Sequence, residues 1–118
     1  MVHGILFQGS VILFNKLDNL GEYKYEVVDT EYWLLYFIKY GKIGLCVAES
    51  KEVINRYGNL PLPSWFNPKH YASAAVGGDT GLVGEIYINN ADKKFVYWLE
   101  AEMHAGQSYS GEIVVVLN

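Results

Sequence analysis

The stretch YWLLYFIKYGKIGLCVAES, residues 32–50, decides the fold class of this chain. Between Tyr32 and Tyr40 nearly every residue is bulky and apolar, and six of these nine are aromatic or β-branched. Because such side chains favour strands and the run is short, it predicts a buried strand and not a helix. Residues 39–42, KYGK, have the composition of a hairpin tip with a lysine on each side. We therefore predict that residues 43–48 form the returning strand.

Working outward from this hairpin, the β pattern continues in both directions. Alternation of apolar and polar residues predicts strands over 83–88, 95–104 and 112–118. The short connections between them indicate an antiparallel meander. Near the N-terminus, two apolar runs surround Gly9 and Ser10, which predicts either a hairpin or one long bulged strand.

One short helix is predicted directly after the 32–50 stretch. Ser50 can cap a helix over Lys51–Tyr57, and Gly58 stands where a left-handed residue would end it. All three prolines follow within residues 59–70, so this segment is expected to be an irregular connection. Its two large aromatic residues, Trp65 and Phe66, are expected to plug one end of the core.

The predicted fold class is therefore mainly β. We expect an antiparallel barrel or sandwich of about seven or eight strands with one or two short helices, spanning residues 1–118 as a single compact domain. The alternative is an α+β fold with a helix near residues 30–40.

Charge and hydropathy narrow the classes of partner. The net charge is −4, only Arg56 among the nine basic residues is arginine, and no run of Lys or Arg occurs. A nucleic-acid partner is not expected, because neutralising phosphates requires a basic footprint. No signal-peptide pattern opens the chain, and no segment reaches the roughly 20 apolar residues of a membrane span, so we expect a soluble cytoplasmic protein with no membrane contact. The single cysteine, Cys46, is expected to be a small core residue.

The predicted strand over 95–104 carries Glu100, Glu102 and His104 two residues apart, so these side chains would share one face. The opposite face is apolar and should point to the core. A zinc site needs three or four ligands, and Glu102 with His104 supplies only two. Neither a metal nor another cofactor is therefore predicted. No phosphate-binding loop and no nucleophile with a neighbouring base is found, so the chain is not expected to be an enzyme.

The leading prediction of function is a small acidic binding protein, most consistent with a bacterial immunity-type inhibitor. Such a protein neutralises a basic toxin domain by occluding its active surface. Aromatic side chains dominate interface hot spots, while carboxylates select a basic partner. The predicted partner-binding residues combine these two properties and lie near the C-terminus, where residues 95–118 contain three Glu and no Lys or Arg. They are Trp98, Glu100, Glu102, His104 and Glu112.

The alternative prediction is a small-ligand or carbohydrate-binding β domain. Its site would be the mouth of a barrel or an aromatic platform. The candidate ligand-binding residues for this function are Trp33, Trp65 and Tyr109.

Overall fold

The computed structural model describes residues 22–51, 55–78, 83–100 and 108–118. These ranges contain eight β-strands and no helix, which confirms the mainly β prediction. The strands are β1 (Tyr23–Asp29), β2 (Trp33–Tyr40), β3 (Ile43–Ser50), β4 (Tyr57–Pro61), β5 (Ala72–Gly78), β6 (Val83–Asn89), β7 (Lys94–Leu99) and β8 (Tyr109–Val116). The predicted N-terminal strands, around Gly9 and Ser10, lie outside the described residues.

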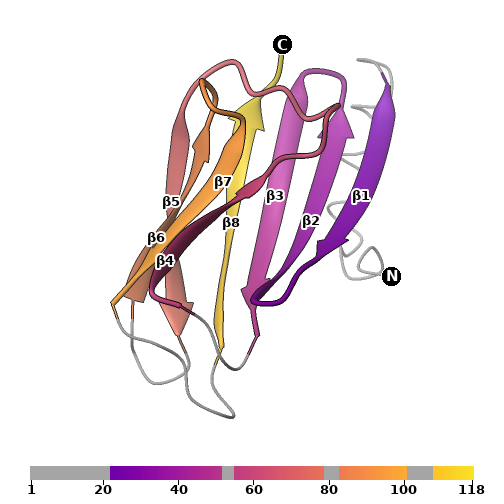
Figure 1. The fold of residues 1–118 in the computed structure, drawn as a ribbon. Coiled ribbons are helices and arrows are strands. Elements are labelled where there is room, and N and C mark those ends of the chain that lie inside the picture. The colour runs from indigo at the N-terminus through magenta and orange to yellow at the C-terminus, as the bar shows by residue number, and fades with distance from the viewer. Residues whose placement is uncertain (1–21, 52–54, 79–82, 101–107) are drawn as a thin grey trace.

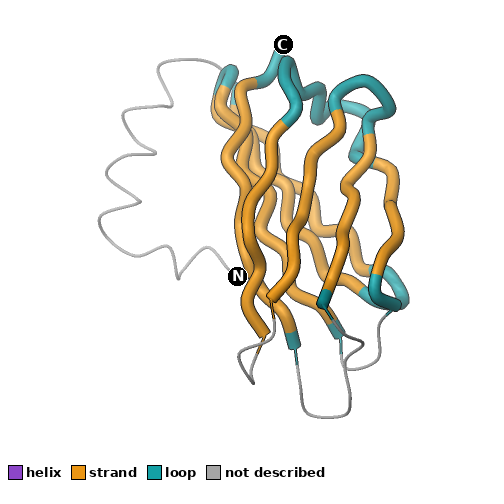
Figure 2. Tube along the Cα trace, turned by 90° about the vertical axis from the view of Figure 1, so that its left-hand side faces the viewer, coloured by secondary structure: helices purple, strands orange, loops and turns teal. Residues whose placement is uncertain are grey.

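All eight strands belong to one antiparallel sheet with the order β1-β2-β3-β8-β5-β6-β7-β4. The sheet curls into a half-open barrel, so that β4, at one end of the order, crosses in front of β8 (Figure 1). Figure 2 shows the described loops gathered at the two ends of the strands. We call β1, β2, β3 and β8 the first half of the sheet, and β5, β6, β7 and β4 the second half.

The hairpin predicted from residues 32–50 is confirmed as β2 and β3. Tyr40 pairs with Ile43, and the two strands stay in register as far as Trp33 and Ser50. Gly41 in the tip has a φ of 57°, a left-handed conformation that glycine adopts without steric cost. Because successive side chains of a strand point to opposite faces, β2 buries Trp33, Leu35 and Phe37 on one face.

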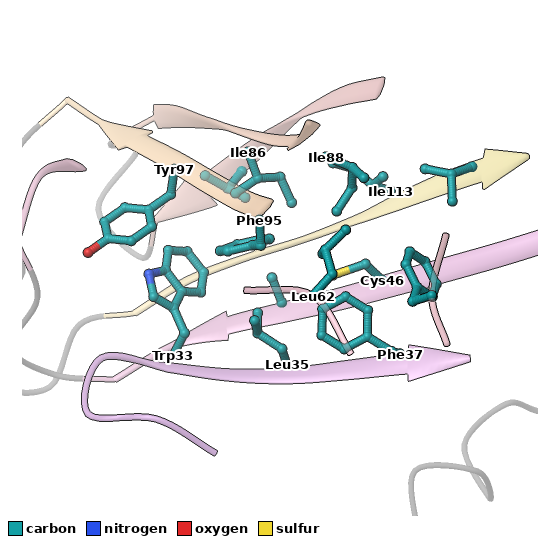
Figure 3. Packing of buried hydrophobic residues seen from close by; sticks show 14 of the residues in the cluster. Trp33, Leu35, Phe37, Cys46, Leu62, Ile86, Ile88, Phe95, Tyr97 and Ile113 are labelled. Carbon is teal, nitrogen blue, oxygen red and sulfur yellow. The ribbon is translucent and has the colours of Figure 1, made fainter. Parts of the chain in front are cut away.

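The core lies where the inner faces of the two halves meet. Side chains of β2 point across to those of β6 and β7 (Figure 3). The ring of Trp33 lies 5.3 Å from that of Phe95 and 5.1 Å from that of Tyr97. Each large side chain buried in this way stabilises the fold by roughly 1.5–3 kcal/mol. Phe95, Tyr97 and Leu99 are all buried, as the alternation in β7 predicts.

The proline-rich connection between β4 and β5 closes one end of the curled sheet (Figure 1). Phe66 is fully buried, and its ring lies 5.0 Å from that of Phe37. Trp65 is half-buried and donates its indole N–H to Glu26 Oε1 on β1, at 2.8 Å. The expectation that Trp65 and Phe66 plug the core is therefore met. The plug also links the two edge strands of the sheet, because it follows β4 directly and reaches β1.

The helix predicted over Lys51–Tyr57 is wrong at its C-terminal end, because Tyr57 is the first residue of β4 and pairs with Trp98. Residues 52–54 lie outside the described part. The Ser50 hydroxyl, at the end of β3, is buried and accepts a hydrogen bond from the Tyr109 N–H at 2.7 Å. Pairing of β4 with β7 thus decides the conformation of Tyr57, which the local helix signals predicted wrongly.

Two further expectations about topology are corrected. The α+β alternative is wrong, since residues 33–40 form β2. The C-terminal meander is confirmed for β6 and β7, which pair, but it is wrong for β8, which does not pair with β7. Instead β8 pairs with β3 and β5, while β4 occupies the free side of β7. The sequence shows each strand locally, but these pairings join segments far apart along the chain.

Candidate interaction surface

The first half of the sheet carries apolar side chains on both faces. Its inner face belongs to the core. Its outer face is fixed by the register, which places cross-strand rows of side chains on the side away from the core. We call these residues the outer apolar face. From one end of the strands to the other, the rows are Tyr23–Tyr40–Ile43–Val116, Tyr25–Ile38–Leu45–Val114, Val27–Tyr36–Val47–Glu112 and Asp29–Leu34–Glu49–Ser110.

Large side chains on this face are exposed over three strands. Val114 is 68% exposed, and Tyr23 and Tyr25 are 49% and 42% exposed. Val27, Ile43 and Val116 are exposed as well. Scattered apolar residues are normal on a protein surface, but a contiguous patch that extends across neighbouring strands is typical of an interaction site.

Charge on the outer apolar face has one sign. None of its residues is Lys or Arg, and its three carboxylates, Asp29, Glu49 and Glu112, lie in the last two rows. Asp29 is neutralised by an ion pair with Lys51. The face therefore changes from apolar to acidic along the strand direction, which suits a partner with an apolar patch next to a basic one.

A groove marks the acidic end of the face. It has a volume of about 510 Å³ and lies over β2, β3 and β8, with Tyr36, Glu49 and Glu112 on its walls. Ser110 and Gly111 also line it. Burial, and then the negative charge of Glu49, raises the pKa of the Tyr36 hydroxyl. The hydroxyl lies in the same groove as the carboxylates of Glu49 and Glu112.

The predicted partner-binding residues do not form one patch. Glu112 lies in the groove. Trp98, 44% exposed, lies on β7 in the second half, three strands away from β8 in the sheet order. Glu100 follows β7, and its Oε1 accepts a hydrogen bond from the Val83 N–H at 3.1 Å. Glu102 and His104 lie outside the described residues.

The three residues of the alternative ligand site are also separated. Tyr109 is fully buried and cannot contact a ligand at the surface, so its expected role is wrong. Trp65 belongs to the plug beside β1. Trp33 is fully buried as well.

Sequence reasoning missed Tyr36 and Glu49. The signal that could have found them is in β2, whose residues are apolar at both odd and even positions. A strand at the surface of a small domain needs only one apolar face. The second apolar face therefore marks β2 as the centre of the candidate interaction surface.

The class of function is not narrowed further by metal ligands, by membrane-spanning helices or by known relatives. Within the described ranges, no three His, Cys, Asp or Glu side chains are close enough to share a metal ion. The same ranges contain no helix with the length and apolar character to cross a membrane. Comparison with known proteins gives no match to a family model, a curated protein or a solved structure.

Proposed function

We propose that this chain is a protein-binding β domain that uses its outer apolar face to bind a basic partner protein. The observation that carries the proposal is the combination of exposed Tyr and Val side chains with carboxylates, and without any Lys or Arg, over four neighbouring strands. A bacterial immunity-type inhibitor of a basic toxin domain, acting in the cytoplasm, is the particular function that we favour. The net charge of −4 supports this choice.

The proposed mechanism is occlusion. The tyrosine and valine side chains would supply the apolar contact area, and Glu49 and Glu112 would pair with Lys or Arg of the partner. Complementary charge would speed association and make it sensitive to salt, since exposed charges are screened over about 8 Å at physiological ionic strength. Because the face is a sheet surface fixed by backbone pairing, it would bind with little change of shape.

The experiment uses the proteins encoded by the genes adjacent to this one as probes, each purified in an inactivated form. Binding is measured by biolayer interferometry at low and high salt. We expect one of them to bind with an affinity that falls as salt rises. The double variant Glu49→Lys/Glu112→Lys should raise its Kd by about 10- to 100-fold, equivalent to about 1.4–2.8 kcal/mol.

Glu85→Lys is the matched control, because Glu85 is an exposed carboxylate on β6 in the second half. It should leave the Kd within about twofold of the wild type. Trp98→Ala tests the patch that the sequence predicted on β7. If Glu85→Lys raised the Kd as much as the double variant does, or if only Trp98→Ala raised it, the interface would lie on the second half. Absence of binding by every probe would reject the proposal.

A further inference from the structure

Strand β1 is one of the two edges of the sheet, and it is the edge better suited to receive another strand. Among the described ranges it pairs only with β2, and it lies at the margin of the sheet in Figure 1. The opposite edge, β4, has five residues and ends at Pro61, which has no backbone N–H. β1 has seven residues, none of which is proline, and it pairs with β2 without a bulge. It therefore lacks the short length, the proline and the bulge that commonly protect an edge.

The free side of β1 presents backbone groups at alternate residues. At one end of the strand, the Gly41 N–H donates to the Glu22 carbonyl at 2.9 Å. At the other end, the Thr30 N–H donates to the Trp33 carbonyl at 2.9 Å. The even-numbered residues of β1 therefore bond to β2. Because the bonding direction alternates along an antiparallel strand, the odd-numbered residues direct their N–H and C=O groups away from β2. These residues are Tyr23, Tyr25, Val27 and Asp29.

Two charged side chains of opposite sign lie on the concave side of β1. Lys24 and Glu26 are exposed, and both lie beside Trp65 of the plug. The indole N–H donates to Glu26 Oε1 at 2.8 Å, and the Lys24 ammonium lies 5.9 Å from the centre of the indole ring. Inward-pointing charges on an edge exclude an apolar strand, which would bury them unpaired. They admit a strand that presents the opposite charges at the same spacing.

A second β1 presents those charges when it runs antiparallel to the first. With a two-fold axis at Tyr25, Lys24 of each copy lies opposite Glu26 of the other. The neighbouring registers, centred on Lys24 or on Glu26, would place identical charges opposite each other, which is destabilising. The register at Tyr25 also matches the backbone, because it pairs odd-numbered residues with one another. On the outer side, Tyr25 would face its copy and Tyr23 would face Val27, which are favourable cross-strand pairs.

We propose that two copies of this chain pair through β1 in a two-fold antiparallel arrangement centred on Tyr25, with Lys24 of each copy bonded to Glu26 of the other. Trp65 would hold Glu26 in place, which reduces the side-chain entropy lost in forming the ion pair. The contact would join the two outer apolar faces edge to edge and leave the groove over β2, β3 and β8 open. This inference does not rest on the proposed binding of a basic protein, because it uses the edge of the sheet and not the acidic groove.

The test measures the mass of the full chain by sedimentation equilibrium over about 1–300 µM protein, a range that covers micromolar values of Kd. We expect the mass to rise with concentration from 13.3 kDa towards twice that value. Lys24→Glu places two carboxylates opposite each other at both ion pairs, and Glu26→Lys places two ammonium groups there. Each variant should raise the Kd of the dimer at least about tenfold.

An equimolar mixture of the two charge variants is the sharpest test. One copy then carries carboxylates at both positions and the other carries ammonium groups at both, so every cross-strand pair again has opposite charges. The mixture should restore the dimer, with a Kd within about threefold of the wild type, although neither variant dimerises alone at the same concentration.

Two further variants separate the edge from other surfaces. Lys69→Glu is the matched charge control, because Lys69 is exposed in the connection between β4 and β5. It should leave the Kd within about twofold of the wild type. Tyr25→Pro removes an N–H from the free side of β1 and none of those that bond to β2, so it should keep the fold and abolish the dimer. Circular dichroism and thermal unfolding check the fold of each variant.

Three results would overturn the proposal. The first is a mass of 13.3 kDa at every concentration. The second is a dimer that Lys24→Glu, Glu26→Lys or Tyr25→Pro leaves unchanged; weakening by Val114→Asp alone would place that contact on the outer apolar face. The third is a mixture of the two charge variants that remains monomeric. If Glu26→Lys fails to fold because Trp65 loses its acceptor, Lys24→Glu and Tyr25→Pro give the answer.

Discussion

The two halves of the sheet have similar inner faces and different outer faces. Inside, both contribute large apolar side chains to one core, including Phe37 from the first half and Phe95 from the second. Outside, the first half is apolar with an acidic end. The second half is mixed: its outward residues include the exposed Tyr57, Val83 and Trp98 as well as Ser73, Glu85 and Lys94. The second half is what alternation in an antiparallel sheet predicts, so it is the first half that calls for a functional explanation.

The difference shows that one strand can bury one of its faces in the core and still carry apolar residues on the other. In β2, the odd residues from Trp33 to Phe37 form the core, while Leu34 and Tyr36 face outward. Ile38 is an outward residue that is only 5% exposed and lies outside the core cluster. The outer side of β2 is therefore nearly as apolar as its inner side. Folding requires only one of these two faces, which leaves the other for binding.

The largest expected effect tests whether the two inner faces contribute equally. Phe37→Ala and Phe95→Ala remove fully buried rings from opposite halves. Each should lower the free energy of unfolding by about 3–5 kcal/mol, measured by urea denaturation. Val114→Ala, at a residue 68% exposed on the outer apolar face, is the control and should change stability by less than about 0.5 kcal/mol. A cost below about 1.5 kcal/mol for either Phe variant would show that its half does not share the core.

A smaller effect is expected at the junction of the halves, where β8 lies against β5. A Cβ on Gly111 would lie 2.7 Å from Val76 Cγ1 and 2.9 Å from the Ala75 carbonyl oxygen. Because backbone must move to make room, Gly111→Ala should cost about 1–3 kcal/mol.

Gly77→Ala is the matched control for the junction, because a Cβ there would meet no atom within 4 Å. It should be neutral or stabilise the protein by about 0.5–1 kcal/mol, since glycine in a strand is entropically unfavourable. Thermal and urea unfolding of both variants measure the difference. Equal effects of the two substitutions would contradict a close approach of β8 to β5.

The smallest expected effect concerns pH and the inner face of the first half. Burial raises the pKa of the Cys46 thiol above its ordinary value of 9.0. The folded state therefore keeps the proton while the unfolded state loses it. Stability is complete below pH 9 and should fall above it by about 1.4 kcal/mol per pH unit. Cys46→Ala should remove this slope between about pH 9 and 10, where tyrosine ionisation is still limited.

Urea denaturation at several pH values measures this slope in the wild type and in Cys46→Ala. The comparison uses the change with pH, so the constant cost of the smaller side chain cancels. An unchanged slope in the variant would mean that the thiol is accessible to solvent in the folded state.

Part of the candidate interaction surface could be predicted from sequence. Glu112 was found because it belongs to an acidic C-terminal region, and it does lie in the groove. Glu49 was missed because nothing local connects it with Glu112; the pairing of β3 with β8 brings the two strands together. Trp98 was predicted to lie with Glu112, but the strand order separates them.

The sequence by itself determined the class of fold, the β2–β3 hairpin and the inward side of β7. These depend on period-2 alternation and on turn residues, which act between near neighbours in the chain. Only the tertiary structure decided that β4 is a strand, that β8 lies between β3 and β5, and that the ring of Trp33 packs against that of Tyr97. Such pairings depend on which strand edges and apolar faces are left to satisfy after the local structure has formed, and no short stretch of sequence contains that information.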